Sequence, residues 1–246
     1  MGRTDASAAH LKVRLLLASA AQFQHLLAPA LTSSPPTALL DIGAGRGEAT
    51  GALASAMGLP ASRVTIMETA AEIRRKLVSE RGFRAVASFD ELGAGERFGA
   101  VSLLNVLDRC DDPLGLLGAA VSALRPDGVL LVATVLPFCP VVYEGVKGKV
   151  GAHRAPRHAL RLPPSLRCGW GEKLGNHDGD RYLMEKTFLD RRRFAEHLSG
   201  FISATVGTLP LRVVAWTRVP YLSTGTTEQT YYHLDNALLV LRRTRD

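Results

Sequence analysis

Residues 39–48 read Leu39-Leu40-Asp41-Ile42-Gly43-Ala44-Gly45-Arg46-Gly47-Glu48. The apolar start predicts a buried strand over residues 38–42, and the glycines predict a turn that leads into a helix over residues 46–57. Each glycine can take a positive φ or let a ligand approach the backbone closely. The first turn of the helix offers unpaired backbone N–H groups. We therefore predict a ligand-binding turn between this strand and this helix.

The spacing of the turn is acidic-x-Gly-x-Gly-x-Gly, which differs from the Gly-x-Gly-x-x-Gly that cradles the pyrophosphate of dinucleotides. It is typical of class I methyltransferases, whose ligand S-adenosylmethionine (SAM) carries no phosphate. We predict that the Asp41 carboxylate takes a cationic or hydroxyl group of this cofactor. The predicted contacts of the turn are Asp41, Gly43, Ala44, Gly45 and Gly47. The alternative is a glycine-rich turn that binds no ligand.

Acidic residues follow the next two predicted strands. Glu68 ends a strand over residues 63–68, where a carboxylate can accept hydrogen bonds from both ribose hydroxyls. The alternative for Glu68 is a helix-capping or surface carboxylate, and we include its neighbour Thr69 in the cofactor site. Asp90 follows a strand over residues 83–87. Asp90 can accept from the exocyclic amine of adenine or, alternatively, cap a helix.

The remaining strands complete a predicted sheet. Residues 98–105 and 129–136 are apolar enough for buried fourth and fifth strands, and residues 211–219 and 231–241 predict a closing antiparallel pair. Five strands that alternate with helices, followed by such a pair, predict the α/β fold of the Rossmann-like class I SAM-dependent methyltransferases. This fold has a seven-stranded, mostly parallel sheet with an antiparallel C-terminal strand pair.

The length of 246 residues suits one domain. We assign residues 1–246 to a single methyltransferase domain that begins with an N-terminal helix and loop over residues 1–37. Residues 143–186 are rich in Lys, Arg, Pro and Gly, and we predict a basic, loop-rich insertion there. This insertion is either a solvated loop or a lid that faces the substrate.

Composition limits the possible partners and cellular location of the protein. The chain is 46% hydrophobic, which is enough for a large core, and its net charge of +7 indicates either an anionic partner or a solvated basic surface. No apolar run approaches the roughly 18 residues of a membrane span. Three scattered cysteines without a Cys-x-x-Cys pair predict neither a disulfide framework nor a metal site. We therefore expect an intracellular protein, cytoplasmic by default.

Three further groups of residues carry a family resemblance. They are Leu104-Asn105-Val106-Leu107-Asp108-Arg109-Cys110-Asp111, Val135-Leu136-Pro137-Phe138, and Thr217-Arg218-Val219-Pro220-Tyr221-Leu222 with Tyr231-Tyr232-His233-Leu234-Asp235. With the glycine turn they resemble the methyltransferase-like protein 9 (DREV) family. The resemblance implies a SAM-dependent protein-histidine methyltransferase that methylates the pros nitrogen of histidine in His-x-His motifs. It also implies a histidine-rich protein or peptide substrate, and association with endomembranes or mitochondria.

The chemistry of histidine methylation suggests roles for these residues. Imidazole, with a pKa of about 6.5, is mostly neutral at pH 7, so the enzyme must fix its tautomer and stabilise the imidazolium that forms. We predict that Asp108 does both and that Asn105 positions SAM or the ring; the alternative for Asp108 is a helix cap. The predicted catalytic residues are Asp108, Asn105 and Tyr232. The resemblance implies substrate contacts by Asp108, Arg109, Asp111, Phe138, Tyr221 and Tyr232, where the tyrosines can alternatively be packing aromatics.

Two other functions stay open. An RNA or small-molecule methyltransferase is the alternative that the basic insertion motivates. Base recognition usually interleaves aromatic with basic residues, and Trp170 and Tyr182 are the only aromatics between Gly145 and Lys186, so we do not expect a nucleic acid partner. A SAM-binding protein without catalysis is the third class. We expect a monomer.

Overall fold

The computed structural model describes residues 17–31, 35–146, 149–166, 189–224 and 231–244 of the chain. Within these ranges, the side chains of residues 143–146, 149–153, 221–224 and 231–233 lie outside the description. Seven strands form the main sheet, in the order β3-β2-β1-β4-β5-β9-β8, and a hairpin forms a separate two-stranded sheet.

The main sheet has a parallel part and an antiparallel part. The parallel strands are β1 (Leu39–Ile42), β2 (Val64–Met67), β3 (Arg84–Val86), β4 (Phe98–Leu104) and β5 (Leu124–Leu136). Strand β9 (Tyr231–Arg243) pairs antiparallel with β5, and β8 (Leu211–Thr224) pairs antiparallel with β9. The predicted α/β fold class, with its closing antiparallel pair, is therefore confirmed.

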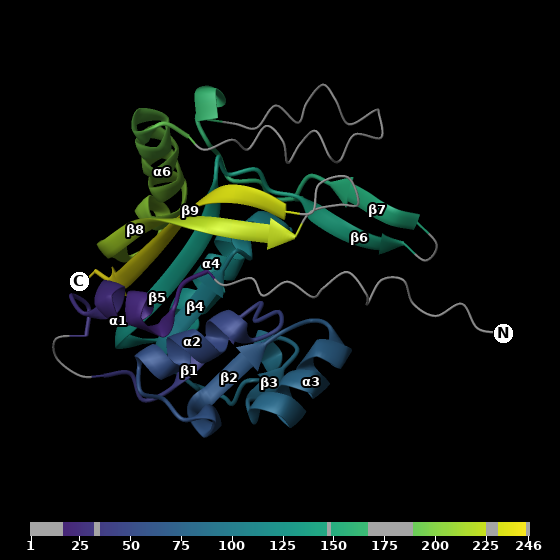
Figure 1. Cartoon of the computed structure of the whole chain (residues 1–246), viewed down its shortest axis with the longest axis vertical. Coiled ribbons are helices and arrows are strands. Elements are labelled where there is room, and N and C mark those ends of the chain that lie inside the picture. Colours follow the sequence, from purple (N-terminus) through teal and green to yellow (C-terminus); the bar gives the residue numbers. More distant parts are fainter. Residues whose placement is uncertain (1–16, 32–34, 147–148, 167–188, 225–230, 245–246) are drawn as a thin grey trace.

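Helices cover both faces of this sheet (Figure 1). They are α1 (Ala20–Leu27), α2 (Glu48–Ala56), α3 (Ala71–Arg81), α4 (Pro113–Ala123) and α6 (Arg191–Thr205). Because successive strand side chains point to opposite faces, Leu39 packs in the core with α1, α2 and α3, and Leu40 packs in the core with α4 and α6. All four residues of β1 are buried, as expected for the centre of a doubly covered sheet.

The described part of the chain between the sheet and α6 contains regular structure. Residues 143–186 were expected to be loop-rich, but β6 (Val142–Val146) and β7 (Lys149–Arg154) form an antiparallel hairpin and residues 164–166 form a 3-10 turn. Figure 1 shows this hairpin projecting from the body of the molecule. The glycines in this stretch favoured a loop in the sequence, yet valine and tyrosine beside them suit strands.

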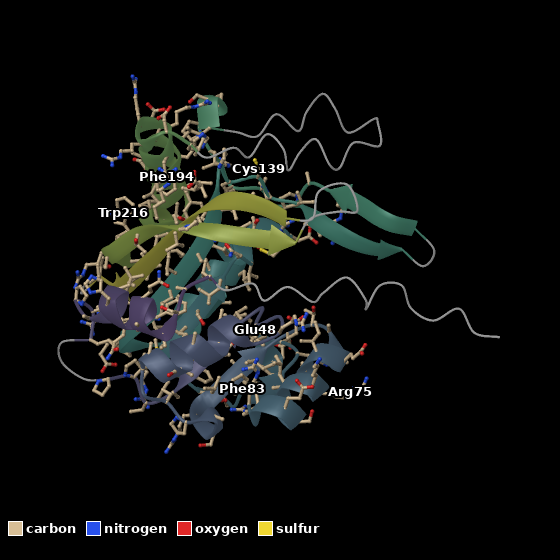
Figure 2. The ribbon with its side chains drawn as sticks, in the orientation of Figure 1. Glu48, Arg75, Phe83, Cys139, Phe194 and Trp216 are labelled. Atoms are coloured by element: carbon tan, nitrogen blue, oxygen red, sulfur yellow. The ribbon has the colours of Figure 1, made fainter. Side chains whose placement is uncertain are left out.

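The antiparallel end of the sheet is joined to α6 by a partly buried ion pair. Nε and Nη2 of Arg218 each donate to the Asp235 carboxylate at 2.7 Å, and the backbone N–H of Leu189 donates to the same carboxylate at 2.7 Å. The guanidinium lies 4.6 Å from the ring centre of Phe194, which stacks on Trp216 (Figure 2). These contacts fix the start of α6 against β8 and β9.

Two further observations concern the helices and one cysteine. None of the described helices combines the length and the apolar character needed to cross a bilayer. Cys139, buried just after β5, is disulfide-bonded, whereas the scattered cysteines predicted no disulfide framework. Scattered cysteines give no pairing signal in a sequence, because the fold alone sets their distance.

Candidate active site

The three glycines of the turn after β1 share a positive φ, and two of them also pack closely against side chains. Gly43, Gly45 and Gly47 have φ values of 73°, 52° and 76°, in the left-handed region that favours glycine. A Cβ atom on Gly43 would lie 2.4 Å from Val106, and one on Gly47 would lie 2.6 Å from Leu77. A Cβ on Gly45 would meet no atom within 4 Å. Gly43 and Gly47 thus serve close packing, and the turn is open at Gly45.

The structure brings Glu68 to this open turn. The backbone N–H of Gly45 donates to Glu68 Oε2 at 3.3 Å, and the N–H of Ala70 donates to Oε1 at 3.1 Å. A half-buried carboxylate beside a turn that is open to solvent suits SAM, whose ribose hydroxyls are donors. The donor and acceptor groups present therefore fit the predicted cofactor. When bound, SAM supplies an electrophilic methyl group.

Asp41 lies beneath the turn and is 2% exposed. Its carboxylate accepts from the hydroxyls of Thr50 at 2.5 Å and Ser102 at 2.6 Å. Burial raises the pKa of Asp41 to about 6. The carboxylate therefore links β1 to α2 and β4, and direct contact with the cofactor stays a prediction.

The other predicted cofactor contacts lie around the same edge of the sheet. Ala44 is half-buried within the turn, and Thr69 is exposed and donates through Oγ1 to Glu68 Oε1 at 3.3 Å. Asp90 is exposed in a 3-10 turn, Phe89–Glu91, that follows β3. Their contacts with SAM stay predictions.

The end of β4 carries the predicted catalytic pair. Asn105 follows the last residue of the strand and has φ 58°, and Asp108 lies in a 3-10 turn, Leu107–Arg109. Val106, between them in sequence, packs against Gly43 of the cofactor turn. The structure therefore brings Asn105 and Asp108 to the same edge of the sheet as the glycine turn.

Asp108 is buried, with 1% of its surface exposed. Its Oδ2 atom lies 3.4 Å from Nε of Arg109, whose charge partly compensates the buried carboxylate. Its Oδ1 atom is buried and has no hydrogen-bond partner among the described residues. Leaving a buried acceptor without a donor costs about 1–3 kcal/mol, so this atom is suited to accept from a ligand.

Two residues with implied substrate contacts also have partners within the protein. Both Asp111 carboxylate oxygens accept from the Arg154 guanidinium, and the backbone N–H of Arg157 donates to Oδ1 at 3.2 Å. The Arg154 guanidinium holds the pKa of Asp111 well below its usual range. Asp111 thus anchors the end of β7. Phe138 is 2% exposed and packs against Phe201 at 5.2 Å between ring centres, and its contact with substrate stays a prediction.

The side chains of Tyr221 and Tyr232 lie outside the described part of the chain. Their backbones are placed on β8 and β9, where Tyr221 is opposite Leu234 and Tyr232 is opposite Ser223. Their predicted contacts with substrate stay predictions, as does the catalytic role of Tyr232.

One residue that sequence reasoning did not include joins this edge. Asn236 of β9 is fully buried and donates through Nδ2 to Oδ1 of Asn105 at 2.8 Å. The two residues are 131 positions apart, so no local pattern could have indicated the contact.

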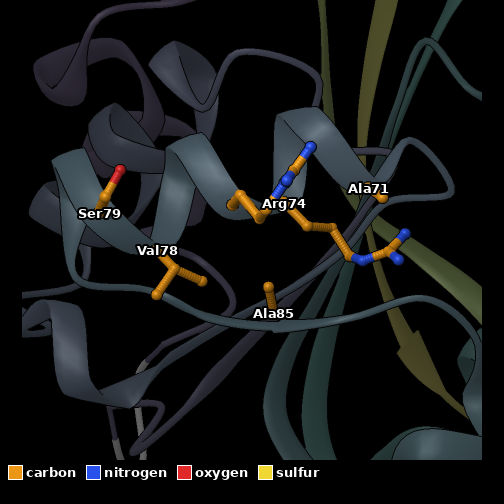
Figure 3. A pocket seen from close by; sticks show the side chains of 6 residues that line it. Ala71, Arg74, Val78, Ser79 and Ala85 are labelled. Carbon is orange, nitrogen blue, oxygen red and sulfur yellow. The ribbon is translucent and has the colours of Figure 1, made fainter.

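Two surface pockets lie beside α3 and α6, and Arg74 of the first donates to the backbone carbonyls of Glu68 at 2.6 Å and Thr69 at 2.7 Å. One, of about 350 Å³, lies between α3 and β3 and is lined by Arg74, Val78 and Ala85 among others (Figure 3). The other, of about 640 Å³, lies between α6 and the 3-10 turn at residues 164–166. Neither pocket is lined by a residue of the predicted site.

The strand order, the glycine turn after β1 and the carboxylate after β2 define a class I methyltransferase that uses SAM. The family model described as DREV methyltransferase matches residues 1–163. The chain therefore belongs to the DREV methyltransferase family. The predicted family, the general class of enzyme and the cofactor are confirmed.

Comparison with solved structures finds similar chains at low sequence identity. One, from the conversion of a disulfide bond into a thioacetal group during echinomycin biosynthesis, has TM-score 0.50 and 19% identity and covers 91% of this chain and 81% of its own. The 1,6-didemethyltoxoflavin-N1-methyltransferase of Burkholderia thailandensis has TM-score 0.49 and 20% identity, with 93% and 80% covered. The N-methyltransferase NodS of Bradyrhizobium japonicum WM9 has TM-score 0.45 and 13% identity, with 92% and 87% covered.

Proposed function

We propose that this protein is a SAM-dependent protein-histidine methyltransferase that methylates the pros nitrogen of histidine in His-x-His motifs. The observation that carries the proposal is the Oδ1 atom of Asp108, a buried acceptor without a hydrogen-bond partner among the described residues. A neutral imidazole has one N–H donor and one nitrogen lone pair. Asp108 accepts from the N–H, and the lone pair of the other nitrogen is left for the methyl group.

The pKa of the nucleophile supports a histidine. A free lysine, with a pKa of about 10.4, must lose a proton before it can attack, at a cost of about 4–5 kcal/mol at pH 7. Imidazole, with a pKa of about 6.5, is already mostly neutral. The site therefore needs a group that orients the ring more than it needs a strong base, and a fixed carboxylate is suited to that task.

The reaction forms a nitrogen–carbon bond at the pros nitrogen as the methyl–sulfur bond breaks. Positive charge moves onto the ring, and the Asp108 carboxylate stabilises the imidazolium through the hydrogen bond to its far nitrogen. The product later releases that proton to water. Arg109, 3.4 Å from the other oxygen, keeps the carboxylate in place.

A second candidate, an RNA methyltransferase, is favoured by the net charge of +7, which would attract a phosphate backbone. The two candidates make different predictions for Asp108. A histidine ring needs its carboxylate as an acceptor, whereas attraction to phosphates comes from surface cations.

The proposal is tested by incubating the full chain with labelled SAM and either a His-x-His peptide or total RNA. We expect label in the peptide, located on the pros nitrogen by mass spectrometry and NMR. Asp108→Asn should lower kcat by about 10⁴, as the same change does in the Ser-His-Asp triad by leaving the wrong tautomer, while calorimetry shows unchanged SAM binding. Asp127→Asn, at an exposed position of β5, is the matched control. Label in RNA alone would refute the proposal.

A further inference from the structure

Asn236 reaches the active-site edge from the antiparallel end of the sheet. It lies on β9, opposite Val135 of β5 and Val219 of β8, and its side chain is fully buried. Its Nδ2 donates to Oδ1 of Asn105 at 2.8 Å. Its own Oδ1 has no partner among the described residues, so Asn105 is the only described hydrogen-bond partner of this side chain.

Asn105 is held from two sides in a sparsely populated backbone conformation. Among the described non-glycine residues it alone has a positive φ, 58°. Its backbone N–H donates to the Ala133 carbonyl of β5 at 2.9 Å, and its side chain is bound by Asn236 of β9. Asparagine tolerates this region better than most residues, and such conformations persist where the surroundings fix them.

The contact with Asn236 also fixes which way the Asn105 amide faces. An asparagine amide has an acceptor end, Oδ1, and a donor end, Nδ2. Because Asn236 binds Oδ1, the donor end is directed away from β9. Asp108, three positions later, is an acceptor through its unpaired Oδ1. The end of β4 therefore carries one fixed donor and one fixed acceptor.

We propose that Asn236 is a specificity-determining positioning residue, which fixes the Asn105 amide so that its Nδ2 donates to an acceptor atom of the substrate. This inference rests on the proposed function, in which the acceptor is a ring nitrogen of the second histidine in His-x-His. Two neutral imidazoles offer the required pair, an N–H for Asp108 and a ring nitrogen for Asn105.

Substitution of Asn236 by aspartate reverses this arrangement. A carboxylate only accepts, so Asn105 must turn its Nδ2 towards β9 and present Oδ1 to the substrate. With a His-x-His peptide, Asn236→Asp should raise KM about tenfold while kcat and the Kd of SAM change by less than about twofold. With a peptide in which phenylalanine replaces the second histidine, KM should be the same for both proteins.

Two controls separate this role from a structural one. Thr134→Val removes a buried hydroxyl of β5 that also has no described partner, and it should leave both KM values unchanged. In an Asn105→Ala background, Asn236→Asp should have no further effect on KM, because Asn236 acts through Asn105. A tenfold rise for the phenylalanine peptide, or in the Asn105→Ala background, would overturn the inference.

The amide orientation is tested without any substrate by NMR of the 15N-labelled full chain, with signals assigned from Asn105→Ala and Asn236→Ala. The side-chain NH2 of Asn236 should exchange slowly in the wild type, and that of Asn105 should become the slow one in Asn236→Asp. A slowly exchanging Asn105 NH2 in the wild type, bound to Asn236, would overturn the inference even if histidine peptides are methylated. If they are not methylated but the exchange pattern holds, the proposed function fails and the orientation stands.

Discussion

The backbone N–H of Gly45 donates to Oε2 of Glu68 at 3.3 Å, across 23 positions of sequence. This bond joins the turn after β1 to the end of β2, which lie next to each other because the two strands pair in parallel. Carboxyl ends of adjacent parallel strands meet at one edge of the sheet, and ligands bind there in open α/β folds. The bond therefore marks the cofactor side of the molecule.

Glu68→Gln should weaken SAM binding. The amide keeps an oxygen for the Gly45 N–H but loses one acceptor and the charge that holds the ribose hydroxyls. We expect the Kd of SAM, measured by calorimetry, to rise about tenfold with little change in Tm. Glu72→Gln, an exposed carboxylate in the first turn of α3, is the matched control and should leave the Kd unchanged. Equal effects of the two changes would argue against a ribose contact.

Gly43→Ala should destabilise the fold more than an ordinary glycine change. The new Cβ adds the strain of a left-handed alanine to a contact at 2.4 Å with Val106, for a loss of about 2–4 kcal/mol in unfolding free energy. Gly58→Ala has a similar φ of 66° but open space around the Cβ, so it should cost only about 1 kcal/mol. Urea denaturation measures both.

A double variant tests whether the contact with Val106 causes the cost of Gly43→Ala. In a Val106→Ala background, Gly43→Ala should cost only about as much as Gly58→Ala, because the Val106 γ-carbons at 2.4 and 3.3 Å are gone. An undiminished loss in that background would place the strain somewhere other than at Val106.

Asp41 should make the stability depend on pH. Burial raises its folded pKa from 3.8 to about 6, so between these values the native state binds more protons than the unfolded state. Stability therefore falls as pH rises from about 4 to about 6 and is constant above, with a total penalty of about 3 kcal/mol. Asp41→Asn removes the titration, and the stability of the variant relative to wild type should rise by about that amount over this window. A constant difference would mean that Asp41 does not titrate there.

Asp235→Ala should be costly because it leaves Arg218, which is 29% exposed, without its carboxylate. Breaking such a partly buried pair lowers the unfolding free energy by about 2–4 kcal/mol. It also removes the acceptor of the Leu189 N–H, so hydrogen exchange should speed up at the start of α6. Glu196→Ala breaks the exposed pair with Arg192 and should cost only about 0.5 kcal/mol.

The sequence was sufficient for the architecture because its signals are local. The apolar run of β1, the glycines and Glu68 each follow from spacing within a few residues, and the structure joins them as expected. The signals for helix starts are also local. Ser19, for example, forms a capping box with Gln22 at the start of α1. The hairpin β6–β7 was not predicted, because the glycines of this stretch favour a loop although its valines and tyrosine favour strands.

The parts of the site that the sequence did not reveal depend on tertiary contacts. Whether Asp111 faces a substrate or an arginine depends on where β7 returns, and the structure places Arg154 there. Phe138 follows an apolar strand and continues into the core, which a motif match does not distinguish from a pocket wall. Asn236 reaches Asn105 only because β9 inserts between β5 and β8.

The central claim concerns one atom, Oδ1 of Asp108. The most direct measurement is the structure of the full chain with S-adenosylhomocysteine and a His-x-His peptide. We predict that Oδ1 lies about 2.7–3.0 Å from the far ring nitrogen of the target histidine, whose pros nitrogen faces the sulfur of the cofactor product. A complex in which Oδ1 of Asp108 contacts no group of the peptide would contradict the account.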